Sequence, residues 1–115
     1  MPDETFYDLP TISAERAKAA KLYQEFLRVP AMSAGVYVLA AGATDPQKPH
    51  NEDELYYVVR GRAKMIVASE EHVVKTGSVI FVPAKVEHRF FDISEELELL
   101  VMFAPAETEY ERVLG

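Results

Sequence analysis

The residues of this sequence best suited to chemistry are a histidine and a glutamate that precede an apolar run. His50 and Glu54 are four positions apart, so in an extended strand both side chains lie on the same face. A neutral imidazole and a carboxylate that converge from a rigid element are typical ligands of a divalent metal ion. Tyr56 and Val58 share this parity, which indicates that the same face continues into an apolar interior.

A second histidine, His88, stands in a comparable place later in the chain. Gly77, an apolar run, Pro83 and a short turn precede it, and another apolar run follows. This order predicts that His88 lies at the start of another strand. The third histidine, His72, lies between a polar turn and a strand, where we expect it to be exposed.

The N-terminal part of the chain is predicted to form an arm and one amphipathic helix. Residues 1–12 are polar and irregular, with two prolines. Ser13 is a suitable N-cap for a helix over residues 14–28, which Pro30 would end. The apolar side chains of this helix recur at spacings of three and four residues: Ala19, Leu22, Tyr23, Phe26 and Leu27.

The rest of the chain has the pattern of short strands separated by turn residues, which indicates a β-sandwich or β-barrel. Arg60-Gly61-Arg62 is predicted to be a tight hairpin, and the acidic residues 107–115 a short helix or a loose tail. The expected organisation is one structural domain, with an arm and helix over residues 1–33 and a barrel with a short tail over residues 34–115. The expected strands cover residues 35–41, 55–59, 63–68, 72–75, 78–82, 88–93 and 97–103.

Taken together, the two histidine-containing segments resemble the two motifs of the cupin superfamily. The matching positions are Gly42, His50, Glu54 and Gly61 for the first motif, and Gly77, Pro83 and His88 for the second. The resemblance covers roughly residues 34–104. It implies a small single-domain cupin, that is, an all-β protein with a double-stranded β-helix (jelly-roll) barrel, to which the one N-terminal helix is added.

The resemblance also implies a mononuclear metal site, in which the usual ligands are three histidines and one glutamate. Lys48 stands at the position of the first histidine, and a protonated lysine has no lone pair for a metal. A motif with a longer spacer would place Gln47 there instead, as a candidate fourth ligand. The implied site therefore holds one divalent ion on His50, Glu54 and His88, which suits iron, manganese, nickel, copper or zinc. The alternative is a cupin that keeps the barrel without the ion.

The side chains expected around the metal site form a pocket for a small molecule. Tyr56 is also a candidate proton donor, since it follows the ligands on the same face. Lys48 lies at the expected mouth of the barrel. Glu52 is expected in an exposed acidic loop, although it shares the parity of Glu54 and could replace it as a ligand. The interior residues expected to line the pocket are Tyr56, Met65, Phe90 and Met102.

The composition argues against several classes of protein. The 115 residues include no cysteine, so neither a disulfide nor a thiolate metal site can form. The net charge is −7 and the lysines and arginines are not clustered, which argues against binding to nucleic acid. No apolar run approaches the roughly 20 residues that cross a membrane. The acidic N-terminus lacks the order of a secretion signal, and we expect a cytoplasmic protein.

The function expected from these residues is metal-dependent chemistry on a small organic substrate. An oxygenase-like oxidoreductase is the leading hypothesis, because two imidazoles and one carboxylate form the ligand set associated with non-haem iron. The alternatives are a cupin that binds a small ligand without turnover and a metal-independent isomerase or epimerase. Tyr57 and Val59 make the other face of their strand apolar as well, which predicts a homodimer that covers it.

Overall fold

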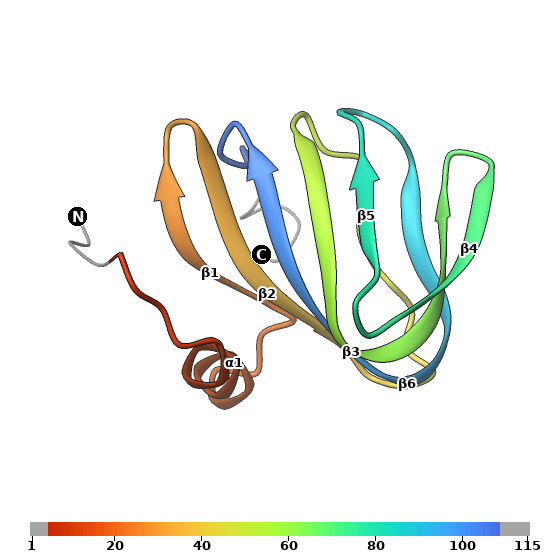
Figure 1. The fold of residues 1–115 in the computed structure, drawn as a ribbon, viewed down its shortest axis with the longest axis horizontal. Coiled ribbons are helices and arrows are strands. Elements are labelled where there is room, and N and C mark those ends of the chain that lie inside the picture. The colour runs from red at the N-terminus through yellow and green to blue at the C-terminus, as the bar shows by residue number, and fades with distance from the viewer. Residues whose placement is uncertain (1–4, 109–115) are drawn as a thin grey trace.

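The computed structural model describes residues 5–108, which form one antiparallel sheet with a helix outside it (Figure 1). The sheet order is β1-β2-β6-β3-β4, and β5 pairs with β3. The predicted all-β class with one N-terminal helix is confirmed. The elements are α1 (Leu9–Lys18), β1 (Tyr23–Val29), β2 (Met32–Leu39), β3 (Asp53–Val67), β4 (Glu70–Lys75), β5 (Val79–Val82) and β6 (His88–Ala104). No helix among the described residues is long and apolar enough to span a bilayer.

Two long strands, β3 and β6, pair along most of their length and fold the sheet over on itself (Figure 1). The first half of β3 pairs with β5 and its second half with β4, so the two halves belong to different walls. The pairing of β3 with β6 shifts register between Val58 and Lys64, which marks bulges where both strands bend. The predicted hairpin at residues 60–62 is therefore wrong, because the chain continues there as one strand. Likewise, residues 88–93 and 97–103 belong to one strand rather than two.

Gly61 makes this bend possible. Its φ of 105° lies in the left-handed region that favours glycine. A Cβ atom at this position would overlap the carbonyl oxygen of Glu96 and would lie 2.7 Å from the Cα of Leu97 on β6. Only a residue without a side chain lets β6 pass so closely over the bend in β3.

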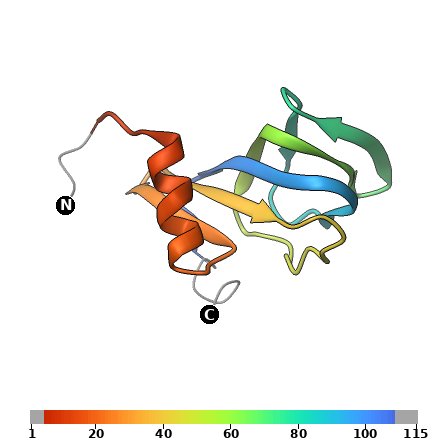
Figure 2. The same cartoon turned by 90° about the horizontal axis from the view of Figure 1, so that it is seen from below.

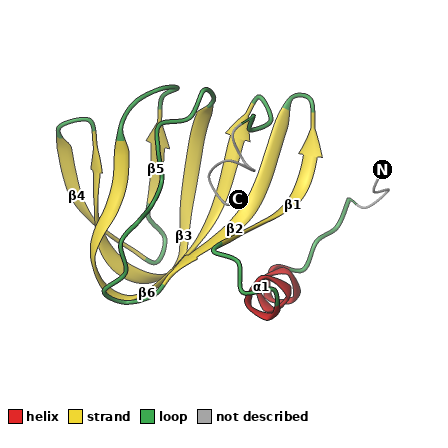
Figure 3. Ribbon diagram, turned by 180° about the vertical axis from the view of Figure 1, so that it is seen from behind, coloured by secondary structure: helices red, strands yellow, loops and turns green. Residues whose placement is uncertain are grey.

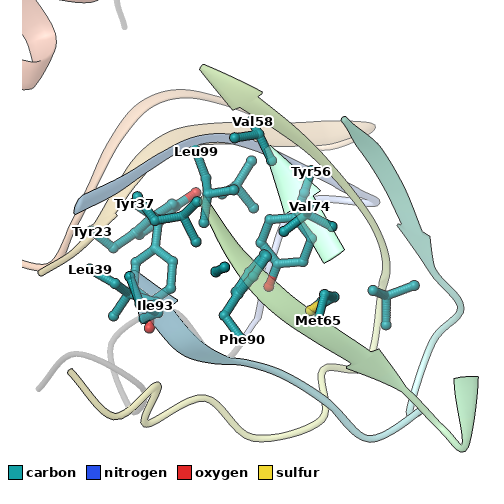
Figure 4. Packing of buried hydrophobic residues seen from close by; sticks show 14 of the residues in the cluster. Tyr23, Tyr37, Leu39, Tyr56, Val58, Met65, Val74, Phe90, Ile93 and Leu99 are labelled. Carbon is teal, nitrogen blue, oxygen red and sulfur yellow. The ribbon is translucent and has the colours of Figure 1, made fainter. Parts of the chain in front are cut away.

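The apolar core lies between the two walls. Along β3, residues 54, 56 and 58 are buried, whereas residues 53, 55 and 57 are exposed, as the parity of the sequence predicts. Figure 4 shows Tyr56, Met65, Phe90 and Leu99 gathered in this interior. The start of β3 therefore directs its inward side chains into the same space as the core.

The N-terminal helix begins earlier than the sequence predicts. Asp8, not Ser13, is the N-cap, and its carboxylate accepts a hydrogen bond from the backbone N–H of Thr11 at 3.1 Å. Pro10 is tolerated because the N–H groups of a first helical turn have no partner within the helix. Since α1 ends at Lys18, the predicted helix over residues 14–28 is wrong beyond that residue.

Residues 23–29 form strand β1 rather than the second half of a helix. Within its pairing to β2, Phe26 is the extra residue of a bulge between Glu25 and Leu27. The bulge interrupts strict alternation, which leaves Tyr23 in the core and Phe26 on the outer face. For this reason the apolar spacing of the segment imitates a helix. The true helix, α1, covers the outer face of β1 and β2 (Figure 2 and Figure 3).

We predict that Gly61→Ala lowers the free energy of unfolding by more than about 2 kcal/mol, because left-handed strain of about 1–3 kcal/mol adds to the overlap with β6. Gly77→Ala is the matched control, since Gly77 also has a positive φ (95°) but a Cβ there meets nothing within 4 Å. Urea unfolding followed by circular dichroism measures both variants. Equal losses would show that the close approach of β6 has no energetic consequence.

Candidate metal centre

The three side chains that the sequence predicts as metal ligands meet at one end of the interior. His50 lies in the loop before β3, Glu54 is the second residue of β3, and His88 is the first residue of β6. Their ligand atoms all lie within 4.8 Å of one another, and all three residues are buried. A hydrogen bond from the N–H of Lys85 to the carbonyl oxygen of His50, at 2.6 Å, ties the β5–β6 loop to the β2–β3 loop.

Glu54 is a buried carboxylate that accepts no well-oriented hydrogen bond from the described residues. Its Oε1 lies 3.1 Å from Nε2 of His88 and 3.9 Å from Nε2 of His50. Among residues 5–108, no group donates a well-oriented hydrogen bond to either of its oxygens. A buried charge without such partners is strongly unfavourable, so the site has the electrostatics of one that a cation completes.

The orientation of His88 leaves one ring nitrogen available to a cation. Its Nδ1 donates a hydrogen bond to the carbonyl oxygen of Val86 at 2.9 Å, which leaves a lone pair on Nε2. Burial lowers the pKa of His88, but the Glu54 carboxylate, the Val86 carbonyl and Asp45 together raise it, so that the net pKa lies above the usual value. A proton would therefore compete with a metal ion for this nitrogen.

Gln47 also faces the cluster. Its Oε1 lies 3.2 Å from Nε2 of His50 and accepts a hydrogen bond from the Tyr56 hydroxyl at 2.9 Å. Its amide nitrogen donates to Asp45, which keeps the amide oxygen turned toward the imidazole. Burial and the nearby Glu54 carboxylate raise the pKa of Tyr56 well above its usual value, so the phenol keeps its proton.

Asp45 is a structural support of the site that sequence analysis missed. This buried carboxylate accepts hydrogen bonds from the Tyr37 hydroxyl at 2.6 Å and the Phe90 backbone N–H at 3.0 Å, as well as from Gln47. It thereby joins β2 and β6 to the loop that contains His50. The Asp-Pro pair at residues 45–46 signals a turn, but its partners on β2 and β6 are beyond the reach of a local pattern.

Glu107 is a second residue that sequence analysis missed. It belongs to the segment expected to be a short helix or a loose tail, yet it is 3% exposed, and its Oε2 lies 2.9 Å from Nδ1 of His50. Burial raises the pKa of Glu107 above its usual value, although contact with His50 opposes this change. No sequence signal places it here, because the contact depends on where β6 ends. The rest of the predicted tail, residues 109–115, lies outside the described residues.

Glu52 is buried rather than exposed, contrary to the expectation of an exposed acidic loop. Its Oε2 accepts hydrogen bonds from the backbone N–H of Thr108 at 3.2 Å and from the hydroxyl of the same residue at 2.7 Å. The carboxylate is thus turned toward the end of the described chain. The cluster of ligand atoms contains Glu54 and not Glu52.

The other predicted pocket residues lie in different surroundings. Tyr56 and Phe90 are buried with their rings edge to face and 5.0 Å between ring centroids. Met65 is buried as well, and it lines a groove of about 490 Å³ beside β4 and β5. Lys48 is exposed in the β2–β3 loop. His72 is exposed, as predicted.

Met102 does not face the interior, so its prediction as a pocket residue is wrong. Its partner on β3 is the exposed Leu55, whereas the neighbouring Phe103 lies opposite Glu54 and is buried. Met102 is therefore on the outer face of the sheet. Because this part of β6 is apolar on both faces, residue types alone do not show which parity points inward.

Comparison with known proteins identifies the class that this fold and site define. The sequence profile of a family described as the cupin domain matches residues 35–103. The chain therefore belongs to the cupin domain family, and the predicted cupin-type barrel is confirmed.

Relatives extend this likeness over most of the chain. The sequence is 50% identical over 102 residues to the uncharacterized protein SCO3923 of Streptomyces coelicolor, which is 89% of this chain and 97% of that protein. The solved structure of TT1209 from Thermus thermophilus has a TM-score of 0.70 at 26% identity and covers 90% of this chain and 99% of its own. The DMSP lyase DddQ from Ruegeria pomeroyi has a TM-score of 0.62 at 21% identity, over 66% of this chain and 39% of the lyase, and is similar in fold alone.

We predict that Asp45→Ala lowers the free energy of unfolding by about 2–4 kcal/mol, because each buried donor left without an acceptor costs about 1–3 kcal/mol. Tyr37→Phe is the matched control, since it removes one donor and leaves the carboxylate bonded to the others; we expect a loss of about 1 kcal/mol. Thermal and urea unfolding measure both. The assigned role is contradicted if Asp45→Ala costs no more than Tyr37→Phe.

Proposed function

We propose that this cupin binds one divalent metal ion through His50, Glu54 and His88. The observation that carries the proposal is the Glu54 carboxylate, whose buried oxygens accept no well-formed hydrogen bond from the described residues. Nε2 of His88 lies 3.1 Å from this carboxylate and likewise takes part in no well-formed hydrogen bond. Lone pairs from two imidazoles and one carboxylate thus converge, as they do in the ligand sets of iron, manganese, nickel, copper or zinc.

The other buried carboxylates near the site support this interpretation by contrast. Asp45 is bonded to donors from β2 and β6, and Glu52 is bonded to the backbone and hydroxyl of Thr108. Glu54 instead has imidazole nitrogens and, beyond them, the amide oxygen of Gln47 around it. Protein donors reach both oxygens of Asp45 and one oxygen of Glu52, whereas neither oxygen of Glu54 accepts a well-formed hydrogen bond from the described residues. A cation is the partner that suits Glu54.

For the reaction, we propose oxygenase-like chemistry on a small organic substrate. A bound divalent ion would supply Lewis-acid or oxygen-activating chemistry, and two imidazoles with one carboxylate leave coordination positions open. Tyr56 holds a proton on its phenol oxygen, 2.9 Å from Gln47, and is the candidate proton donor. The rings of Phe90 and Phe103 pack against Tyr56 and His50, which keeps this end of the interior apolar.

We predict that protein purified without a chelator or a histidine tag contains close to one metal ion per chain, and that His50→Ala or His88→Ala removes most of it. His72→Ala is the matched control, because this exposed histidine lies outside the cluster. Elemental analysis measures the content. Adding the native metal at about 100 times its Kd would stabilise the wild type by about 2.7 kcal/mol.

Unchanged metal content in the His50→Ala/His88→Ala double variant would refute the metal site. The rival function, a cupin that holds a small ligand without turnover, predicts ligand-dependent thermal stabilisation that survives a chelator. Thermal unfolding with and without chelator therefore separates the two functions.

We further propose that the protein forms a homodimer through the outer face of β3 and β5. Leu55 lies opposite Phe81, and Tyr57 lies opposite Val79, across this strand pair. These four apolar side chains are 36–62% exposed. α1 packs on the outer face at β1 and β2, so it leaves this outer patch for another partner. A second copy that presents the same patch would cover it.

We predict that Phe81→Glu converts the dimer to a monomer, because it would bury a charge in the proposed interface. Val29→Glu is the matched control, since Val29 at the end of β1 is 39% exposed, within the range of the patch residues, but lies on a different strand pair. Light scattering during size-exclusion chromatography at micromolar concentration gives the mass. A monomeric wild-type protein would rule out the homodimer.

A further inference from the structure

After β6 the chain turns back over the β2–β3 loop. We call residues 105–108 the C-terminal strap. The N–H of Ala106 donates a hydrogen bond to the carbonyl oxygen of Pro30 at 3.3 Å, and Thr108 donates two hydrogen bonds to Glu52. These bonds attach one end of the strap to the β1–β2 turn and the other end to the β2–β3 loop, which contains His50.

Glu107 is fixed at the centre of the strap by its backbone. Its N–H donates to Oγ of Ser33 at 2.9 Å, and its carbonyl oxygen accepts from the guanidinium of Arg28 at 2.7 Å. Arg28 is itself oriented by Glu25, to which it donates two hydrogen bonds. With its backbone fixed in this way, the Glu107 side chain reaches Nδ1 of His50 at 2.9 Å.

We propose that Glu107 is a positioning residue that orients His50 for metal binding, an inference that rests on the proposed metal site. A carboxylate only accepts hydrogen bonds, so a charged Glu107 at 2.9 Å from Nδ1 favours the ring hydrogen on Nδ1, in competition with the neutral amide oxygen of Gln47 at 3.2 Å from Nε2. With the hydrogen on Nδ1, the lone pair is on Nε2. Nε2 is the atom that faces Glu54. In His88 the acceptor near Nδ1 is the carbonyl oxygen of Val86, which forms a hydrogen bond at 2.9 Å, whereas Glu107 lies in close contact with Nδ1 of His50.

This role differs from that of a metal ligand. Glu107 lies on the Nδ1 side of the ring, and it is not one of the three residues whose ligand atoms converge within 4.8 Å. Its negative charge makes the imidazole a stronger donor to a cation bound at Nε2. Because the strap holds Glu107 in place, the affinity for the metal depends on a segment that contributes no ligand.

The test measures Co²⁺ affinity and the His50 tautomer in the full-length protein. We expect Glu107→Ala to weaken Co²⁺ binding about 10–100-fold, the usual effect of losing such a partner. Glu107→Gln keeps an acceptor oxygen and should weaken binding less. Glu71→Gln is the matched control, because it removes an exposed carboxylate on β4. Nitrogen-15 NMR of the metal-free proteins should show hydrogen on Nδ1 of His50 in the wild type and a mixture of tautomers in Glu107→Ala.

Unchanged Co²⁺ affinity together with an unchanged His50 tautomer in both Glu107 variants would overturn the inference. If Glu107→Ala does not fold, Glu107→Gln decides the question, and it must bind Co²⁺ more weakly than Glu71→Gln does. A wild-type protein that binds no Co²⁺ would refute the proposed metal site, whereas the tautomer of His50 would still test the role of Glu107.

Discussion

The buried carboxylate of Glu54 is the constraint on which the rest of the site depends. Strand parity places it on the inward face of β3, next to Tyr56 and Val58 in an apolar interior. An unpaired charge in such a place costs on the order of several kcal/mol. The loop before β3 and the start of β6 bring the imidazoles of His50 and His88 to this carboxylate, and a bound cation would compensate its charge further. Site and core are therefore parts of one packing arrangement.

The second requirement is that the loops carrying the imidazoles be rigid. Loops are the most mobile parts of most domains, yet metal ligands must keep their geometry to within a fraction of an ångström. Here the backbone of Lys85 bonds to that of His50, and Asp45 joins the same loop to β6 through the Phe90 N–H. Gly61 contributes from a distance, since it allows β6 to fold over β3 and brings the start of β6 to the start of β3.

Local patterns could predict the direction of Glu54 because strand parity determines its face. His50 lies in the loop before β3, so its place beside Glu54 depends on the contacts of that loop, such as the bond from the N–H of Lys85 to its carbonyl oxygen. The same kind of reasoning failed at Phe26, where one bulge residue changed the phase of a strand, and at Gly61, whose left-handed φ suits a bend as well as a hairpin. Glu107 was beyond local patterns altogether, because its contact depends on the path of the chain after β6.

Membership of the cupin family does not select a reaction, because function depends on the side chains at the site. Cupins usually have a further histidine at the metal site. In the proposed centre the amide of Gln47 lies near the cluster instead, and an amide oxygen is a weaker donor to first-row metals than an imidazole. Metal affinity would then depend more on the two imidazoles, and so on the groups next to their Nδ1 atoms.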